Sequence, residues 1–403
     1  MHDETAFVLL VLVFGYALVS GLVGRWYVAP ALIFVLLGMA LGPFGLDLLH
    51  AGPGVEGYTV LAQVALSVIL FVQASALDLR RVLRRREISF RLIVIGIPLT
   101  ILLNTLMAVL VLPVLSLWEA VCLAAIVAPT EAALIHALLV DRRIHERIRH
   151  ALSVESGLYD GFALAALLAA LALASAEADA DPGRWAWFGF RVEIVSIAVG
   201  IGIGLTGGLL MSWSRSRSWL DDTWAQLAAL ALALICFGAG ESLHASGFVA
   251  AFVAGLAFAH VSRSRQGTPI GTGVCGAAAQ LLELMVFAMF GAFAVIDGWR
   301  QSTWRVVVFA LLVLFAVRVA AVLVALIGTD LPLSERLFIG WFGPRGIGTV
   351  VLGLLVIKGG AIERAGEIGT VVVVTVTLSL VLHSLTAAVG IRGRRDTSPV
   401  APG

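Results

Sequence analysis

The sequence predicts an all-α polytopic membrane protein, and three observations support this fold class. The 403 residues are 60% hydrophobic and only 13% charged, whereas soluble domains carry about 25% charged residues. The apolar residues form long runs of about 20 residues, the length of helix that crosses a bilayer core of about 30 Å. Proline interrupts two of these runs, which indicates broken helices, because proline lacks the N–H that a helix interior needs.

We expect about thirteen transmembrane helices in one integral membrane domain, residues 1–403. The acidic N-terminus lacks the basic region of a signal peptide, so the first run is expected to remain as a span. The expected spans are residues 5–23, 27–46, 59–78, 91–113, 118–139, 150–175, 189–212, 223–240, 246–262, 276–296, 303–327, 335–358 and 368–390.

The arginines predict the orientation. Most of them lie in the connectors that follow odd-numbered spans, above all in residues 80–91 and 142–149, and in the tail 392–403. Connectors rich in Arg and Lys stay in the cytoplasm. We therefore expect an external N-terminus, a short cytoplasmic C-terminal tail, and an inner (cell) membrane location with lipid as the surrounding partner.

The two broken helices predict an inverted repeat. Span five breaks at Ala128-Pro129-Thr130-Glu131 and span twelve breaks at Gly343-Pro344-Arg345-Gly346. Equivalent breaks seven spans apart are expected when two six-helix repeats of opposite orientation are joined by one helix. The repeats are expected at about 1–176 and 220–391, with the linking helix at about 189–212.

The chemistry is expected in residues 127–161, where acidic side chains interrupt apolar sequence. Ionisable residues deep in a membrane are costly and therefore usually functional. At about 1.5 Å per helical residue, Glu131 and Asp160 both reach the middle of the bilayer. With Thr130 and Ser156 they could supply the oxygen ligands that hard cations prefer. Burial disfavours a charged carboxylate, so Asp160 is the best candidate for the group that exchanges a proton.

The other buried charges have structural interpretations. Glu155 and Arg345 are expected to form an ion pair, each making the other tolerable at depth. Arg318 is the other arginine within a span and could face Asp160. Glu131 could instead balance the dipole of a half-helix. Glu241 and Glu283 lie near the ends of expected spans, where solvent would reach them.

Other patterns indicate packing. The glycine-rich run at residues 200–208 contains GxGxG, but it lies within an apolar span, so close helix packing is favoured over nucleotide binding. Cys122, Cys236 and Cys275 share no metal-ligand spacing and are expected to be buried, inert thiols. We expect no cofactor, no nucleotide and no nucleic acid.

Three motifs resemble those of the monovalent cation–proton antiporter superfamily, in the sodium/proton exchanger (NhaP/NHE-like) branch. IVAPTEAAL at residues 126–134 is similar to the Thr-Asp-Pro segment of its unwound fifth helix. VESGLYDG at residues 154–161 is similar to the Glu-Ser-x-x-Asn-Asp-Gly segment of its sixth. GWFGPRGIG at residues 340–348 resembles the Gly-x-Arg-Gly segment of its twelfth. The likeness covers most of the chain.

The resemblance implies an NhaA-like antiporter fold, usually a homodimer, that exchanges Na⁺, or else K⁺ or Li⁺, for protons in pH homeostasis. It implies that Asp160 binds cation and proton alternately, that Thr130, Glu131 and Ser156 help to coordinate, and that Glu155 pairs with Arg345. The sequence departs from the family pattern at Glu131 and Ala132, which bears on ion choice.

Tyr159 replaces the family's usual Asn before Asp160. A tyrosine is neutral near pH 7, so it adds no second charge to the site. We therefore expect electroneutral exchange by alternating access. Two other function classes remain open from the residues alone. They are a cation channel or efflux system that uses the same side chains, and, less favoured, an intramembrane hydrolase based on Ser153 or Ser156.

Overall fold

A computed structural model describes residues 3–24, 26, 28–50, 56–77, 88–141, 143–177, 182–262, 272–360 and 362–392. Within these residues every regular element is a helix, as the composition predicts. The arginine-rich stretch 78–87, Arg142 and the tail from residue 393 onward lie outside the described residues, so the structure does not address the charges expected there.

The first part of the chain forms helices up to the end of the sixth expected span. They are α1 (Asp3–Gly24), α2 (Pro30–Leu41), α3 (Glu56–Ala76), α5 (Ser89–Arg91), the π-helical turn η1 (Leu92–Gly96), α6 (Ile97–Val111), α7 (Leu117–Ile126), the 3₁₀ turn η2 (Ala133–Ile135), α8 (His136–Val140) and α9 (Glu146–Glu177).

The remainder continues in the same way. Its elements are α10 (Pro182–Ser216), α11 (Asp222–Ser242), α12 (Gly247–Ser262), α13 (Thr272–Phe290), the π-turn η3 (Gly291–Val295), α14 (Ile296–Gln301), α15 (Trp304–Leu311), the π-turn η4 (Leu312–Val317), α16 (Arg318–Ala325), α17 (Leu333–Trp341), α18 (Ile347–Gly359) and α19 (Ala365–Arg392).

Each of the thirteen expected runs contains a helix. Nine helical segments of the described residues are long and apolar enough to cross a membrane, and four shorter apolar helices, α2, α7, α12 and α18, occupy other expected runs. Some helices extend beyond the apolar run that predicted them. α9 begins at Glu146 rather than near residue 150, and the linking helix α10 covers 182–216 rather than 189–212. Hydropathy marks the apolar part of a helix, whereas the helix itself continues into the polar margin.

Both predicted breaks are present. α7 ends at Ile126 and helix resumes only at Ala133, while α17 ends at Trp341 and α18 starts at Ile347. In the first gap Pro129 can donate no hydrogen bond, and Pro344 has the same effect in the second. The two gaps meet, since the N–H of Glu131 donates to the carbonyl of Pro344 over 2.8 Å. This bond joins segments more than 200 residues apart.

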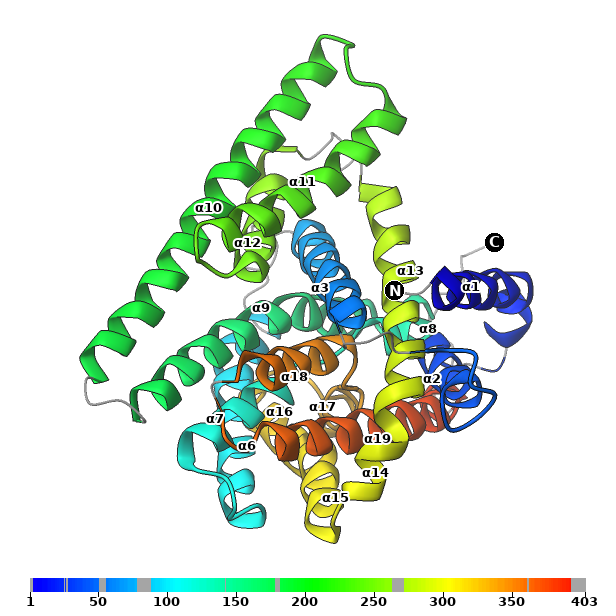
Figure 1. The fold of residues 1–403 in the computed structure, drawn as a ribbon, viewed down its shortest axis with the longest axis vertical. Helices are drawn as coiled ribbons and strands as arrows, with labels where there is room; N and C mark the ends of the chain where they lie inside the picture. Colours follow the sequence, from blue (N-terminus) through cyan, green and yellow to red (C-terminus); the bar gives the residue numbers. More distant parts are fainter. Residues whose placement is uncertain are drawn as a thin grey trace.

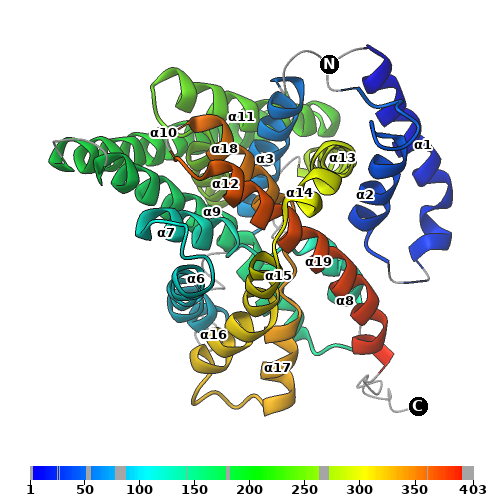
Figure 2. The same ribbon diagram turned by 60° about the horizontal axis from the view of Figure 1, so that its bottom comes forward.

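Two of the three π-turns of the described residues lie in runs that the predicted repeat pairs with each other. η1 lies in the fourth expected run and η4 lies in the eleventh, seven runs later. The two runs pack together, with α6 against η4 and α16 against η1. In Figure 1 these helices lie in the lower part of the molecule, whereas α10 runs diagonally from the lower left to the top and packs with α11 and α12 in the upper part. Figure 2 shows α9, α18 and α19 between the two groups, with α1 and α2 on one flank.

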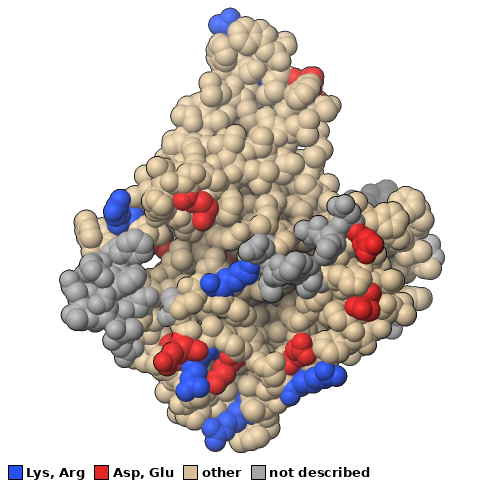
Figure 3. Space-filling view, viewed as in Figure 1, with Lys and Arg blue, Asp and Glu red and all other residues tan. Residues whose placement is uncertain are grey.

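The outer surface suits lipid. Figure 3 shows a broad uncharged area in the upper part of the molecule, bounded by a few charged side chains at its top end and by more of them toward the middle and bottom. Large apolar side chains are exposed, among them Leu18 at 72% and Phe14 at 68% on α1. Inside, Gly200 and Gly204 let α10 pack closely on α12, so the packing interpretation of the glycine run is confirmed. Cys122, Cys236 and Cys275 are all free and buried, as expected.

Candidate functional site

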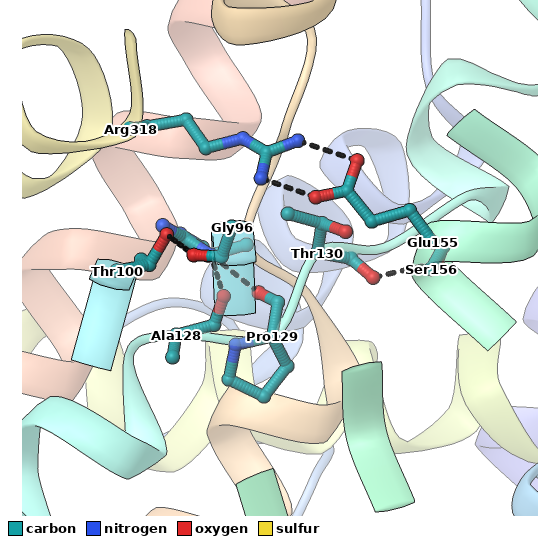
Figure 4. Close-up of polar contacts among 9 residues, drawn as sticks. Gly96, Thr100, Ala128, Pro129, Thr130, Glu155, Ser156 and Arg318 are labelled. Carbon is teal, nitrogen blue, oxygen red and sulfur yellow. Dashed lines mark hydrogen bonds and ion pairs between the residues drawn. The ribbon is translucent and has the colours of Figure 1, made fainter. Parts of the chain in front are cut away.

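The site is built where the two unwound segments cross α9. Ser156 on α9 donates its hydroxyl hydrogen to the carbonyl of Thr130 over 2.6 Å and accepts the N–H of Ala132 over 2.8 Å. Figure 4 shows Ser156 directed at the unwound segment in this way. A hydroxyl has one hydrogen and two lone pairs, so one lone pair of Ser156 stays available to a ligand. Ser156 therefore fixes the unwound backbone, and its hydroxyl oxygen still has a lone pair that could bind a ligand.

Glu131 lies against the first turn of α18. Its side chain is 3% exposed and its carboxylate faces the backbone N–H groups of Ile347 and Gly348. A Cβ atom at Gly346 would come within 2.6 Å of the Glu131 Cβ, so the glycine is what permits this approach. The positive end of a helix favours a nearby carboxylate. This geometry agrees with the expectation that Glu131 balances the dipole of a half-helix.

Asp160 approaches the same turn of α18. It is 3% exposed, and a Cβ atom at Gly348 would lie 2.6 Å from its Oδ1. Its other oxygen, Oδ2, is buried and has no hydrogen-bond partner among the described residues. Leaving a buried polar atom unpartnered is costly. Asp160 therefore has a buried acceptor oxygen without a partner in the described part of the chain, whereas the carboxylate of Glu131 beside it faces backbone N–H groups.

Glu155 pairs with Arg318, so the predicted pair with Arg345 is wrong. Arg318 Nη2 lies 2.8 Å from Glu155 Oε2, and Nη1 contacts Oε1 in the same bidentate arrangement (Figure 4). Both side chains are almost entirely buried. Arg318 therefore neutralises Glu155 and does not face Asp160 as its partner. Bidentate Arg–carboxylate contacts of this kind are the strong, directional ones.

Arg345 instead satisfies the broken backbone. Its Nη1 donates to the carbonyls of Ala128 and Pro129, the latter over 2.9 Å. The backbone N–H of Arg345 donates to the Ser379 hydroxyl over 2.7 Å. A helix break leaves carbonyls without partners, and a membrane interior has no water to supply them. The Arg345 guanidinium supplies these missing donors. It therefore contacts the broken backbone rather than the Glu155 carboxylate.

Tyr159 lies between these groups on α9. It is completely buried and packs with Ile97 and Ala128. Its hydroxyl has no hydrogen-bond partner in the described part of the chain. Tyr159 thus fills space beside the two arginines and adds no carboxylate next to Asp160.

A cavity of about 810 Å³ leads to the crossing. Asp141, in the connector before α9, lies at one part of its wall and Glu131 at another. Arg143 hydrogen-bonds Asp141, with Nη2 and Oδ2 2.7 Å apart, and this holds the pKa of Asp141 below its usual range. Asp160 is not part of the wall. The cavity therefore reaches Glu131 first, and Asp160 lies behind it.

Glu283 belongs to this cavity, contrary to the expectation that it is solvated at the end of a span. It is 8% exposed and lines the wall with Glu131. The apolar run suggested a span of 276–296, but α13 begins at Thr272, so Glu283 lies well inside the helix. A glutamate within an apolar run of 18 or more residues was the signal that could have identified it. Across the described residues, no three His, Cys, Asp or Glu side chains lie close enough to hold one metal ion together.

The buried pair generates a stability prediction. Glu155→Ala and Arg318→Ala should each destabilise the protein by about 3–5 kcal/mol, because each leaves an uncompensated buried charge, and the double variant should lose clearly less than the sum. Thermal melting in detergent measures this double-mutant cycle. The matched cycle of Glu155→Ala with Arg345→Ala should show weaker coupling. Stronger coupling to Arg345 than to Arg318 would contradict the observed pairing.

The comparisons with known proteins agree with this architecture. The chain is 27% identical over 345 residues to a probable Na⁺/H⁺ antiporter of Schizosaccharomyces pombe, covering 81% of this chain and 45% of that protein. It is 23% identical over 354 residues to an Na⁺/H⁺ antiporter of Saccharomyces cerevisiae, covering 82% and 35%. It is 26% identical over 342 residues to the K⁺/H⁺ antiporter NhaP of Alkalimonas amylolytica, covering 84% and 58%. The chain thus spans between about a third and three fifths of these curated relatives.

A solved structure has the same fold. The sodium proton antiporter MjNhaP1 of Methanocaldococcus jannaschii superposes with a TM-score of 0.75 at 20% identity, covering 94% of this chain and 98% of that one. The family described as sodium/hydrogen exchanger, transmembrane, matches residues 8–389. That match includes both helix breaks and every residue of the candidate site. The chain belongs to the transmembrane sodium/hydrogen exchanger family.

Proposed function

We propose that this protein is a secondary active transporter that exchanges a monovalent cation for protons across the cell membrane. The observation that carries the proposal is Asp160, a buried carboxylate with an unpartnered oxygen beside the crossing of two broken helices. Relatives named as Na⁺/H⁺ antiporters favour Na⁺ as the cation, and the relative named as a K⁺/H⁺ antiporter keeps K⁺ open, with Li⁺ as a further candidate. No cofactor is needed for this exchange.

The mechanism is competition for one site with alternating access. Asp160 binds either a proton or the cation, and the cation takes further oxygens from Thr130, Glu131 and Ser156. A bare negative charge at this depth is costly, so the empty site rarely changes the side to which it opens. Each ligand shifts the conformational equilibrium only by its different affinity for the two states. The cost of the empty, charged site is what couples the two fluxes.

The rival functions have less support. The relatives carry the names of antiporters rather than channels. Hydrolysis by Ser156 would need a general base and a free hydroxyl. The Ser156 hydroxyl is engaged with the backbone of Thr130 and Ala132 instead. The family is one of transporters and not of enzymes.

We also propose the finer architecture that the sequence predicts. It has thirteen spans, inverted repeats at about 1–176 and 220–391, the linking helix about 189–212, an external N-terminus and a cytoplasmic tail. The paired breaks in runs five and twelve and the paired π-turns in runs four and eleven support the repeat. A homodimer is proposed because the family resemblance implies it, and the exposed apolar side chains of α1 are compatible with lipid or a second copy.

Asp160→Asn should abolish cation-driven proton movement, because the amide binds no exchangeable proton. The measurement is alkalinisation of reconstituted vesicles that contain a pH dye, with Na⁺, K⁺ and Li⁺ added in turn. Asp297→Asn makes the same change at an exposed aspartate and should keep the wild-type rate. Exchange at the wild-type rate in Asp160→Asn would remove Asp160 from the site.

Gly348→Ala should lower the exchange rate by about tenfold or more, because its Cβ would meet Asp160 Oδ1 at 2.6 Å and displace the carboxylate by a fraction of an ångström. Gly359→Ala, on the same helix, is the matched control, since an added Cβ there has no atom within 4 Å. The same dye assay compares the two. Equal rates would show that the contact with α18 does not position Asp160.

Exchange should be electroneutral. Arg318 neutralises Glu155, Tyr159 carries no charge near neutral pH, and we propose that Glu131 keeps one protonation state beside α18. Of these four groups, only Asp160 then changes charge in the cycle. Vesicles clamped at several potentials with valinomycin and potassium should therefore alkalinise at the same rate when Na⁺ is added. A rate that follows the potential would mean that more than one charge moves per cation.

A further inference from the structure

Glu283 is the buried acid that the mechanism above does not use. It lies on α13, is 8% exposed, and has no hydrogen bond or ion pair among the described residues. It lines the same cavity as Glu131, another buried carboxylate. A carboxylate on the wall of a cavity, with no arginine or lysine beside it among the described residues of that wall, is stabilised when a cation occupies the cavity. Glu283 therefore needs an explanation that packing does not give.

The cavity supplies that explanation. Glu283 and Glu131 line the same space of about 810 Å³, and Asp141 lies on its wall too. None of the described wall residues is a lysine or an arginine. A recess with acidic walls and low-dielectric surroundings concentrates cations. Carboxylates thus lie along the cavity from the connector toward the crossing, with Asp141 paired to Arg143 and Glu283 without an arginine or lysine partner among the described residues.

Uncharged oxygen ligands accompany Glu283. Gln280 precedes it by three residues on α13, a spacing that places both on one helix face, and both line the cavity. Gln73 of α3 lines it as well, and its amide oxygen is buried without a donor among the described residues. Carboxylate and amide oxygens are ligands for hard cations. The set suits a partly hydrated monovalent cation.

This set is separate from the site at Asp160. No three acidic or histidine side chains of the described residues come close enough to share one ion. Glu283 also belongs to a different packing unit. α13 packs along α2 and α3 (Figure 1), whereas Glu131 and Asp160 belong to the unwound segment and α9. Glu131, Asp160 and Glu283 therefore do not form one three-carboxylate site, and Asp160 lies outside the cavity wall that Glu283 shares with Gln73 and Gln280.

We propose that Glu283, with Gln73 and Gln280, forms an outer station where the transported monovalent cation binds before it moves past Glu131 to Asp160. The inference rests on the proposed exchange function and adds a second binding position on the Asp141 side of the membrane. Its role is to raise the local cation concentration and to replace part of the hydration shell. It sets the apparent affinity for the cation rather than the chemistry of proton release.

The test is a comparison of KM and maximal rate in Glu283→Gln, Glu283→Asp and wild type. Vesicles in which the Asp141 side faces the bath are titrated with Na⁺. Glu283→Gln should raise the KM for Na⁺ by about tenfold, the order expected from losing one charge in a partly shielded cavity, and should keep the maximal rate at saturating Na⁺. Glu283→Asp should restore much of the affinity. Glu146→Gln removes an exposed carboxylate that does not line the cavity and should leave KM unchanged.

Two results would overturn the station. They are a KM for Na⁺ in Glu283→Gln within twofold of wild type, or a lowered maximal rate with unchanged KM, which is the sign of a merely structural residue. A second measurement, the rise in melting temperature with added Na⁺ in detergent, reports binding without transport. The concentration for half of that rise should increase in Glu283→Gln by the same factor. If wild-type vesicles exchange no cation, the proposed function fails, and the melting measurement still decides the role of Glu283.

Discussion

The structure depends on the need to satisfy broken backbone in a place without water. Pro129 and Pro344 interrupt two helices, and each interruption leaves N–H and carbonyl groups that the helix no longer pairs. In a bilayer such groups must find partners within the protein. The bond from the Glu131 N–H to the Pro344 carbonyl makes the two gaps partners of each other. The two unwound segments therefore have to lie against each other for the fold to be stable, whatever chemistry takes place there.

The side chains around the crossing divide this work between them. Arg345 serves the carbonyls of the first gap, and Ser156 fastens the same segment to α9. Glu131 and Asp160 then approach the first turn of α18, where glycine leaves space. Arg345 and part of the hydrogen-bonding capacity of Ser156 are thus used to satisfy the backbone. Asp160 Oδ2 keeps no hydrogen-bond partner among the described residues, and its lone pairs are the ones that the proposed exchange would use.

The sequence predicts the broad fold well, but it predicts poorly the direction in which each side chain points around its helix axis. Runs of about 20 apolar residues mark the helices, and Pro129 and Pro344 mark the breaks, because both signals are local properties of the chain. The partner of Glu155 is not local. Depth along each helix places Arg318 and Arg345 equally close to the middle of the bilayer, but the direction in which each points depends on packing. The π-turn η4, which ends just before Arg318, changes that direction and leaves no signature in hydropathy.

Glu283 was misplaced for a related reason. Hydropathy suggested that it lies near a span end, but α13 begins earlier and continues through η3 into α14. The distance of a residue from water depends on where its helix begins and ends and on which helices pack around it. The hydropathy of one run of residues reports neither of these. The expected oxygen-bearing residues Thr130, Glu131, Ser156 and Asp160 do lie around one crossing, because all of them belong to the breaks or to the helix that the break contacts. Their role as ligands remains a prediction.

The burial of all three native thiols makes the chain convenient for chemical labelling. Cys122, Cys236 and Cys275 have no exposed surface, so water-borne maleimides have no ready target in the folded protein. A single new cysteine on the cavity wall, such as one at Ala279, would then carry the whole labelling signal. Its reaction rate would report how long that wall faces water. The wild-type sequence can thus serve directly as the background for mapping which side of the membrane the cavity faces.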